Sequence, residues 1–145
     1  MSIFEYSNIN KFMKGDFMIV SVFKALGDEN RLRILNLLFQ KDLCVCEIEV
    51  ILELNQSNVS RNLRILRKNN FVDTHKEAQW IHYDLSSSFK EKHMELVKYL
   101  EKAFNKNDIF IKDLKRLEKY RDSRFDCQVI GEYKTKVLEV LEVLE

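Results

Sequence analysis

The stretch NQSNVSRNLRILRKNNFV, residues 55–72, follows directly on DLCVCEIEVILEL, residues 42–54. In the later segment Val59, Leu63 and Leu66 recur at the spacing of one face of an α-helix. The earlier segment also has apolar residues at helical spacing, and only a short turn separates the two. Two helices joined so closely predict a helix-turn-helix, whose second helix reads DNA.

Apolar patterns on both sides of this pair predict a mainly helical chain. Further helices are expected at about residues 18–26, 30–39, 89–104, 109–120 and 132–144. The candidate N-caps of the helices are Asp28, Asp42, Asn55 and a serine within Ser86–Ser88. The absence of proline and the presence of only three glycines agree with a helical chain.

The pattern changes after the recognition helix. Phe71–Thr74 favours a strand, and in Trp80–Leu85 apolar and polar residues alternate as they do in a half-buried strand. A polar turn joins the two segments. We therefore predict a winged helix-turn-helix, which is mainly α with a small β-hairpin wing.

The length of 145 residues fits one domain with an appendage at each end. We expect an N-terminal arm at residues 1–16, a DNA-binding and dimerisation domain at residues 17–104, and a helical C-terminal extension at residues 105–145. Three cysteines without a signal peptide favour a reducing, cytoplasmic setting. No apolar run is long enough to predict a membrane span.

The helix expected at residues 89–104 carries an apolar stripe. The stripe comprises Phe89, Met94, Val97, Leu100, Ala103 and Phe104. A wing and short helices offer little core to cover it, so the stripe predicts contact with a second copy of the chain, in a homodimer.

Polar and basic side chains gather on the helix that begins after Asn55, although the net charge of the chain is only +1. Gln and Asn can pair with adenine, Arg can pair with guanine, and Ser hydroxyls suit phosphates. The candidate DNA-binding residues are Gln56, Ser57, Asn58, Ser60, Arg61, Arg64, Lys68 and, in the wing, Lys76, with Arg67 adding positive charge. Two such helices in a symmetric dimer predict an inverted repeat of double-stranded operator DNA.

Two thiols, Cys44 and Cys46, lie near the start of the helix predicted at residues 42–54. On an ideal helix, residues two apart point about 200° away from each other, so both sulfurs hold one ion only if the first turn is distorted. Metal capture would then deform the helix that supports the recognition helix. A helix N-terminus also lowers the pKa of a thiol, which predicts metal capture at neutral pH.

These motifs resemble, in order and spacing, the ArsR/SmtB family of metal-sensing winged-helix repressors, over roughly Phe17–Phe104. The matching segments are KALGDENRLRILNLL (24–38), DLCVCEI (42–48), NQSNVSRNLRILRKNNFV (55–72) and QWIHYDL (79–85). The resemblance implies a repressor that binds operator DNA as a homodimer. It further implies release when As(III) or Sb(III), a regulatory ligand rather than a catalytic cofactor, binds Cys44 and Cys46.

The sequence departs from the arsenic-sensing branch at three places. Glu49 stands where many of these sensors carry a third cysteine, and Glu77-Ala78 forms the wing turn where the family usually has glycine. The third departure is the C-terminal extension, which contains Cys127. Trivalent arsenic commonly takes three thiolates, so Cys127 is the candidate for a third metal ligand.

Other functions remain open. A Cd(II)/Pb(II) sensor of the same fold recruits cysteines from its N-terminal arm, and residues 1–43 contain none. A thiol enzyme with Cys44 as nucleophile needs a base, and no histidine is near in sequence. A module for protein contacts alone would not bind DNA.

The family also has a zinc site on its last helix, but the spacing of His93 and Glu101 does not match the ligand spacing of that site. His82 is expected to face solvent or DNA.

Overall fold

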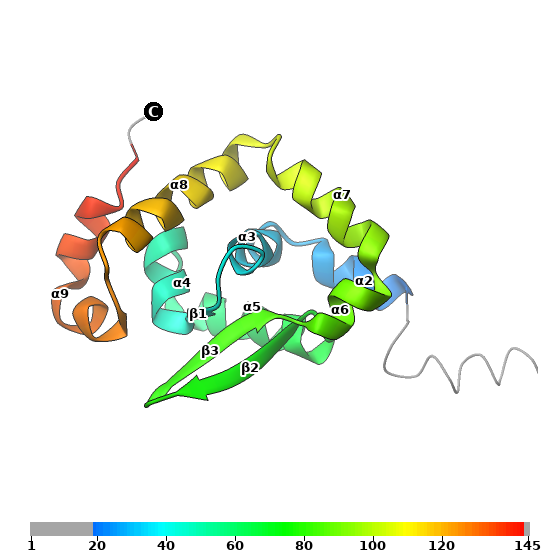
Figure 1. Cartoon of the computed structure of the whole chain (residues 1–145), viewed down its shortest axis with the longest axis horizontal. Helices are drawn as coiled ribbons and strands as arrows, with labels where there is room; N and C mark the ends of the chain where they lie inside the picture. The colour runs from blue at the N-terminus through cyan, green and yellow to red at the C-terminus, as the bar shows by residue number, and fades with distance from the viewer. Residues whose placement is uncertain (1–18, 144–145) are drawn as a thin grey trace, which may run out of the picture.

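The computed structural model describes residues 19–143, so the N-terminal arm expected at residues 1–16 lies outside it. The elements are α2 (Ile19–Leu26), α3 (Glu29–Leu38), β1 (Leu43–Cys44), α4 (Val45–Leu52), α5 (Gln56–Lys68), β2 (Val72–Glu77), β3 (Trp80–Leu85), α6 (Ser87–Lys92), α7 (Met94–Phe104), α8 (Asp108–Asp122) and α9 (Cys127–Val140) (Figure 1). This is the mainly helical fold with a hairpin wing that the sequence predicts. No helix within residues 19–143 has the length and apolarity to cross a membrane.

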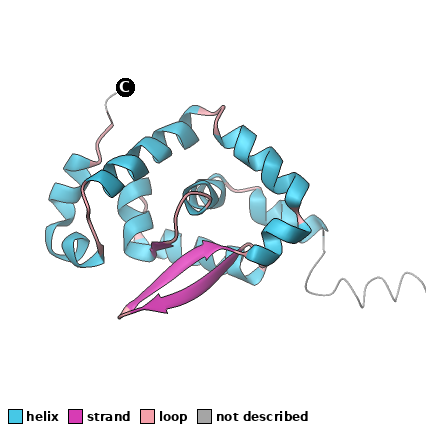
Figure 2. Ribbon diagram, in the orientation of Figure 1, coloured by secondary structure: helices cyan, strands magenta, loops and turns pink. Residues whose placement is uncertain are grey.

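The sheet has three antiparallel strands in the order β1-β3-β2 (Figure 2). The hairpin of β2 and β3 projects from the helices as the wing, and Glu77 pairs with Trp80 across its tip. Ala78 takes a φ of 53° there, a left-handed conformation that favours glycine and costs about 1 kcal/mol for alanine. The sequence did not predict β1, whose two residues pair with Tyr83 and His82 of β3.

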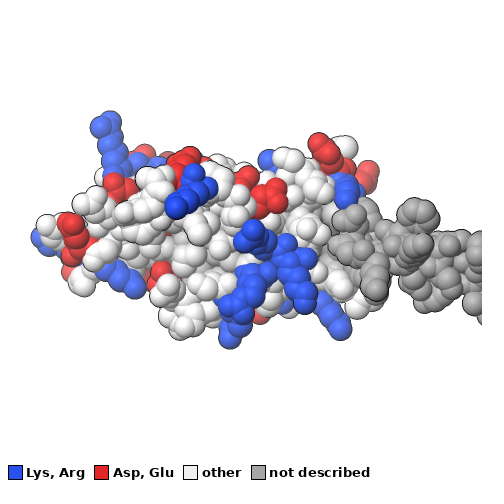
Figure 3. Space-filling model, turned by 90° about the horizontal axis from the view of Figure 1, so that it is seen from below, with Lys and Arg blue, Asp and Glu red and all other residues white. Residues whose placement is uncertain are grey.

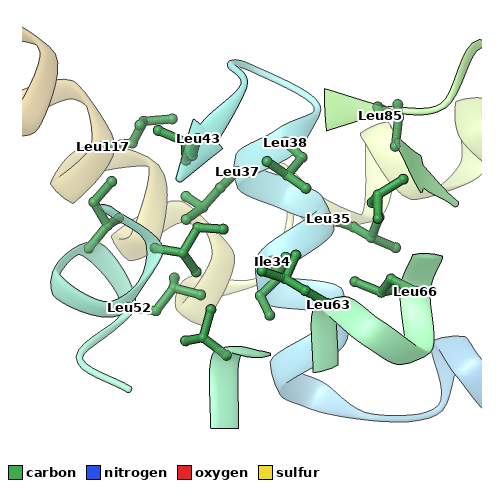
Figure 4. Close-up of a cluster of buried hydrophobic side chains, with 14 of the residues drawn as sticks. Ile34, Leu35, Leu37, Leu38, Leu43, Leu52, Leu63, Leu66, Leu85 and Leu117 are labelled. Atoms are coloured by element: carbon green, nitrogen blue, oxygen red, sulfur yellow. The ribbon is translucent and has the colours of Figure 1, made fainter. Parts of the chain in front are cut away.

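Helix α3 lies at the centre of the hydrophobic core (Figures 1 and 4). Its buried apolar side chains are Ile34, Leu35, Leu37 and Leu38. Around them lie buried leucines from five other elements, namely Leu43, Leu52, Leu63, Leu66, Leu85 and Leu117. Each such side chain stabilises the fold by roughly 1.5–3 kcal/mol on burial, so α4, α5, the wing and α8 share one core.

Three of the four predicted N-caps are confirmed. The side chains of Asp28, Asn55 and Ser86 each accept a hydrogen bond from the backbone N–H three residues later. The prediction for Asp42 is wrong, because α4 begins at Val45 and its N-cap is Cys44. Pairing with β3 keeps Leu43 and Cys44 extended and delays the start of the helix.

Two predicted helix ranges also change. The helix expected at residues 89–104 is divided at His93, whose φ of −123° and ψ of 40° are not helical. Helix α9 begins at Cys127, earlier than residue 132, because the Asp126 side chain accepts from the Val129 N–H at 2.9 Å and caps it. A kink at Tyr133, with φ −132° and ψ 40°, separates this first part from the helical segment that the sequence predicted.

The apolar stripe predicted for dimer contact is mostly part of the chain's own core. Phe89, Leu100 and Phe104 are buried, and Phe104 packs against Phe39 with ring centroids 5.4 Å apart. Met94 remains exposed. The expectation of a continuous intermolecular stripe is therefore wrong for these three members. Phe104 packs on Phe39 and Phe110 of its own chain, and Phe89 packs on Phe71.

The C-terminal extension is tied to the helix-turn-helix by two arginines, half-buried Arg33 and buried Arg116. Arg33 of α3 binds Asp113 of α8 through two hydrogen bonds of 2.7 and 2.9 Å, and it also donates to the Leu52 carbonyl at 3.2 Å. Arg116 of α8 donates to the Val50 and Ile51 carbonyls. These carbonyls belong to the last turn of α4, where cations are stabilised and backbone acceptors lack helical partners. The extension thus caps the helix that supports α5.

Candidate DNA interface and thiol site

Helix α5 has one buried and one exposed face. Val59, Leu63 and Leu66 are completely buried and pack it on the core. A three-residue turn leads into it from α4, and Glu53 there adopts left-handed angles of φ 56° and ψ 42°. This turn directs the N-terminal end of α5 outward, so the helix presents a polar face to solvent as the sequence predicted.

Most of the predicted DNA-binding side chains of α5 lie on this exposed face. Gln56 and Ser57 are exposed in the first turn, and Arg61, Arg64, Arg67 and Lys68 are exposed farther along, whereas Asn58 and Ser60 are half-buried. Lys76 is exposed on β2 of the wing. Figure 3, seen from the side of α5 and the wing, shows Lys and Arg side chains gathered in one place. The local basic surface therefore exists despite the balanced charge of the chain.

A hydrogen-bond network of Arg31, Asn58 and Asn62, which sequence reasoning missed, fixes the orientation of α5. Buried Asn62 donates to the Asn58 side-chain oxygen at 2.7 Å and accepts from the Arg31 guanidinium at 3.1 Å. Arg31 also donates to the Ala25 and Lys24 carbonyls at the end of α2. Because the Asn58 oxygen is already engaged, Gln56 is the better placed of the two amides for bidentate pairing with adenine.

Cys44 lies buried at the junction of β1 and α4. Its backbone N–H donates to Glu47 Oε1 at 2.9 Å, and Tyr120 donates its hydroxyl proton to the other oxygen of Glu47. Burial raises the pKa of the Cys44 thiol to about 12, and the Glu47 carboxylate adds to this effect. The expectation that the helix N-terminus lowers this pKa is wrong, because desolvation and the nearby carboxylate both favour the neutral thiol.

Cys46, in the first turn of α4, contacts the C-terminal extension. It is joined to Cys127, the first residue of α9, by a disulfide whose Cα atoms are 6.1 Å apart. The structure therefore brings together two of the three predicted metal ligands from positions 81 residues apart. The reduced state expected for all three cysteines is not the state of this pair, and Cys44 is the free thiol within residues 19–143.

The three sulfurs do not form one cluster in this state. Among the described residues, the groups of three metal-type ligand atoms within 4.8 Å of one another include one thiol, that of Cys44 with Glu47 and His82. Glu49, at the position of the missing cysteine, faces α9 and lies 3.8 Å from Lys134 Nζ. The face of α4 that carries Cys46 and Glu49 is thus covered by α9.

The buried partners of Cys44 had no signal in the sequence. Tyr120 is separated from Glu47 by 73 residues, and its pKa is raised above the ordinary range by burial and by the hydrogen bond to Glu47. His82, expected to face solvent or DNA, instead packs inward with a side chain 17% exposed. Its position opposite Cys44 in the sheet follows from β1, which was not predicted.

Comparison with known proteins points to one group of regulators. The model of the bacterial regulatory protein arsR family matches residues 28–74. The transcriptional activator HlyU of Vibrio cholerae is 39% identical over 90 residues, which are 62% of this chain and 83% of HlyU. The arsenical resistance operon repressor of Escherichia coli is 40% identical over 68 residues, 46% of this chain. The chain spans only 58% of that repressor's length.

A solved structure agrees on the fold. The homodimeric winged helix-turn-helix DNA-binding domain of Mb0332 from Mycobacterium bovis, described as a possible ArsR-family regulator, superimposes with a TM-score of 0.54 at 24% identity. The match covers 70% of this chain and 88% of that domain. The matching proteins are regulators of transcription rather than enzymes.

Proposed function

This chain belongs to the arsR family of bacterial transcriptional regulators, and we propose that it is a repressor whose affinity for operator DNA is controlled by thiols at the start of α4. The observation that carries the proposal is the contact of Cys46 with Cys127. Cys46 lies on α4, the helix that packs directly against α5. A change at these sulfurs therefore acts one helix away from the DNA-reading surface.

The DNA-binding part of the proposal rests on α5 and the wing. Helix α5 would enter the major groove with Gln56, Ser57 and Asn58 leading, and Arg61 would follow them to base edges. Ser60, Arg64, Arg67, Lys68 and Lys76 would contact or attract the phosphate backbone. We also propose that this DNA-binding regulator is located in the cytoplasm.

A homodimer would bind an inverted repeat through two copies of this surface. Exposed apolar side chains at the α2 and α7 end of the molecule offer the contact. They are Ile19, Val20, Phe23, Met94 and Tyr99, each with more than half of its surface exposed. A patch of this kind on a small domain favours contact with a partner, and the Mycobacterium bovis domain is homodimeric.

In the reduced protein, Cys46 and Cys127 would form a dithiol that bridges α4 and α9. Soft trivalent ions, As(III) and Sb(III), prefer thiolates, and two adjacent sulfurs chelate them. Cys44 would supply the third sulfur only after leaving its site beside Glu47, which would distort the first turn of α4. That distortion links ion capture to release of DNA. Cd(II) or Pb(II) is the less favoured ligand, since residues 1–43 supply no cysteine.

A second candidate signal is oxidation of the same dithiol. The disulfide between Cys46 and Cys127 favours it directly, because this bond covalently ties α4 to α9. The two signals differ in what they require of Cys44. Oxidation leaves this buried thiol unused, whereas a three-thiolate ion site needs it.

The test measures DNA affinity by fluorescence anisotropy. The probe is a duplex selected from a random-sequence pool by the reduced wild-type chain, with titrations repeated after addition of arsenite or of a thiol oxidant. Allosteric coupling of about 1–3 kcal/mol predicts roughly 5- to 150-fold weaker binding after the effective signal.

The variants Cys44→Ser and Cys46→Ser separate the alternatives. Under the ion proposal both variants bind DNA and neither responds to arsenite. Under the oxidation proposal Cys46→Ser loses the response to oxidant, and Cys44→Ser keeps it as the matched control. A reduced chain that selects no duplex would contradict DNA binding itself, and a double variant that still releases DNA would place the switch elsewhere.

A further inference from the structure

A second cluster of ligand-type side chains lies on the surface where the wing meets the loop before β1. His75 of β2 and His82 of β3 are directly paired across the hairpin, and their rings stack with centroids 5.3 Å apart. Asp42 reaches both rings from the segment that leads into β1. One ligand atom from each of these residues lies within 4.8 Å of the other two.

The distances fit a small cation held by nitrogen and oxygen. Asp42 Oδ2 lies 3.3 Å from His82 Nδ1 and 3.5 Å from His75 Nε2. A tetrahedral Zn(II) with bonds of about 2.0–2.1 Å separates neighbouring ligand atoms by about 3.4 Å. These two spacings therefore match those of ligands around one ion.

One atom of the cluster lacks a hydrogen-bond partner. His82 Nδ1 is buried, and no donor or acceptor in residues 19–143 has hydrogen-bond geometry toward it. Buried polar atoms in native structures are nearly always satisfied, so an unsatisfied nitrogen beside a carboxylate oxygen indicates a missing partner. A cation between the two atoms would satisfy both.

Further carboxylates surround the pair. Glu77 Oε1 lies 3.5 Å from His75 Nε2, and Asp84 Oδ1 lies 3.5 Å from His75 Nδ1. A carboxylate on the second ring nitrogen orients a metal-ligating imidazole, which is the arrangement that Asp84 offers to His75. Glu77 is near enough to approach the open coordination position.

We propose that Asp42, His75 and His82 form a binding site for a divalent transition-metal ion such as Zn(II), separate from the thiols of α4. Two imidazoles and one carboxylate select such ions over Mg(II) and Ca(II), which prefer oxygen ligands. The site joins the base of β1 to both strands of the wing. Ion binding would fix the wing relative to the start of α4.

The neighbouring group of Cys44, Glu47 and His82 is a poorer site. Cys44 and Glu47 are buried, and Glu47 is already engaged by Tyr120 and by the Cys44 N–H. Asp42 and His75 are more open to solvent, which gives an ion a path of entry. Ion binding by Asp42, His75 and His82 would not depend on the arsenite or oxidation response of the thiols.

The experiment uses the untagged full chain with the Cys46–Cys127 disulfide intact, so that two of the three sulfurs are masked. Zn(II) is titrated by calorimetry, and Co(II) serves as a spectroscopic probe. We expect one equivalent of Zn(II) per chain. The Co(II) complex should show visible bands of a nitrogen–oxygen site without thiolate-to-metal charge transfer.

The variants His75→Gln and His82→Gln should each weaken Zn(II) binding by at least about tenfold. The third histidine gives the matched control, since His93→Gln should bind as the wild type does. His75 is the safer test because its side chain is 41% exposed and its replacement leaves the core intact. Equal affinity in wild type and His75→Gln, or strong thiolate charge-transfer bands with Co(II), would overturn the proposal.

Discussion

The buried guanidinium of Arg116 should be one of the most sensitive points in the fold. It is 3% exposed and donates to the Val50, Ile51 and Leu141 carbonyls, thereby joining the ends of α4 and α9. The change Arg116→Met keeps much of the side-chain volume and removes every donor. The Val50 and Ile51 carbonyls at the end of α4 and the Leu141 carbonyl at the end of α9 would then lose this donor.

The size of the effect follows from these bonds. A hydrogen bond to a charged group contributes about 1.5–3 kcal/mol, and breaking a buried charged contact on one side costs about 3–5 kcal/mol. We expect Arg116→Met to lower the free energy of unfolding by about 3–5 kcal/mol. This is a large part of the roughly 5–15 kcal/mol available to a domain of this size.

Urea denaturation followed by circular dichroism measures the effect. Arg121→Met is the matched control on the same helix, because Arg121 is exposed and donates to a single backbone carbonyl within residues 19–143, that of Gln40 at 2.9 Å. The control should cost less than about 1 kcal/mol. If Arg116→Met also costs less than about 1 kcal/mol, the extension does not cap α4 as the structure indicates.

Three further predictions follow from the thiol site and the DNA interface. With a pKa of about 12 instead of the ordinary 9.0, Cys44 should react with iodoacetamide at pH 8 about 10³-fold more slowly than an exposed thiol, measured by mass spectrometry of the reduced chain. The folded state favours the neutral Cys44 thiol, so this contribution to stability is fully present below pH 9 and is lost as the pH rises toward 12. The free energy of unfolding should fall over that range by up to about 4 kcal/mol. Subtracting the Cys44→Ala curve from the wild-type curve isolates this fall, and parallel curves would contradict it. Arg64→Ala should weaken binding to all DNA sequences and reduce the salt slope by about 1, whereas Gln56→Ala should relax the preference for one base, as binding-site selection would show.

The parts of the fold that depend on local patterns could be predicted from sequence. Helical spacing located α5, alternation located β3, and side-chain chemistry located the caps at Asp28 and Asn55. The basic surface also followed from local composition, since five of its cations lie within residues 61–76.

Contacts between distant segments could not be predicted. The two residues of β1 carry no periodic signal, yet they make Cys44 the cap of α4 and bury it. The raised pKa of this thiol depends on burial and on Glu47, which a helix-dipole argument alone leaves out. Cys127 was a candidate partner of the other thiols, but only the packing of α9 on α4 shows that it meets Cys46 rather than Cys44.

One measurement tests directly whether thiols at the start of α4 control the affinity of α5 for DNA. The dissociation constant of the selected duplex is measured for the reduced chain and for the same chain after arsenite or oxidant, with Cys46→Ser in parallel. We predict at least about fivefold weaker binding for the wild type after one of the two signals and no change for Cys46→Ser. Equal affinity of the wild type under all three conditions would contradict the claim.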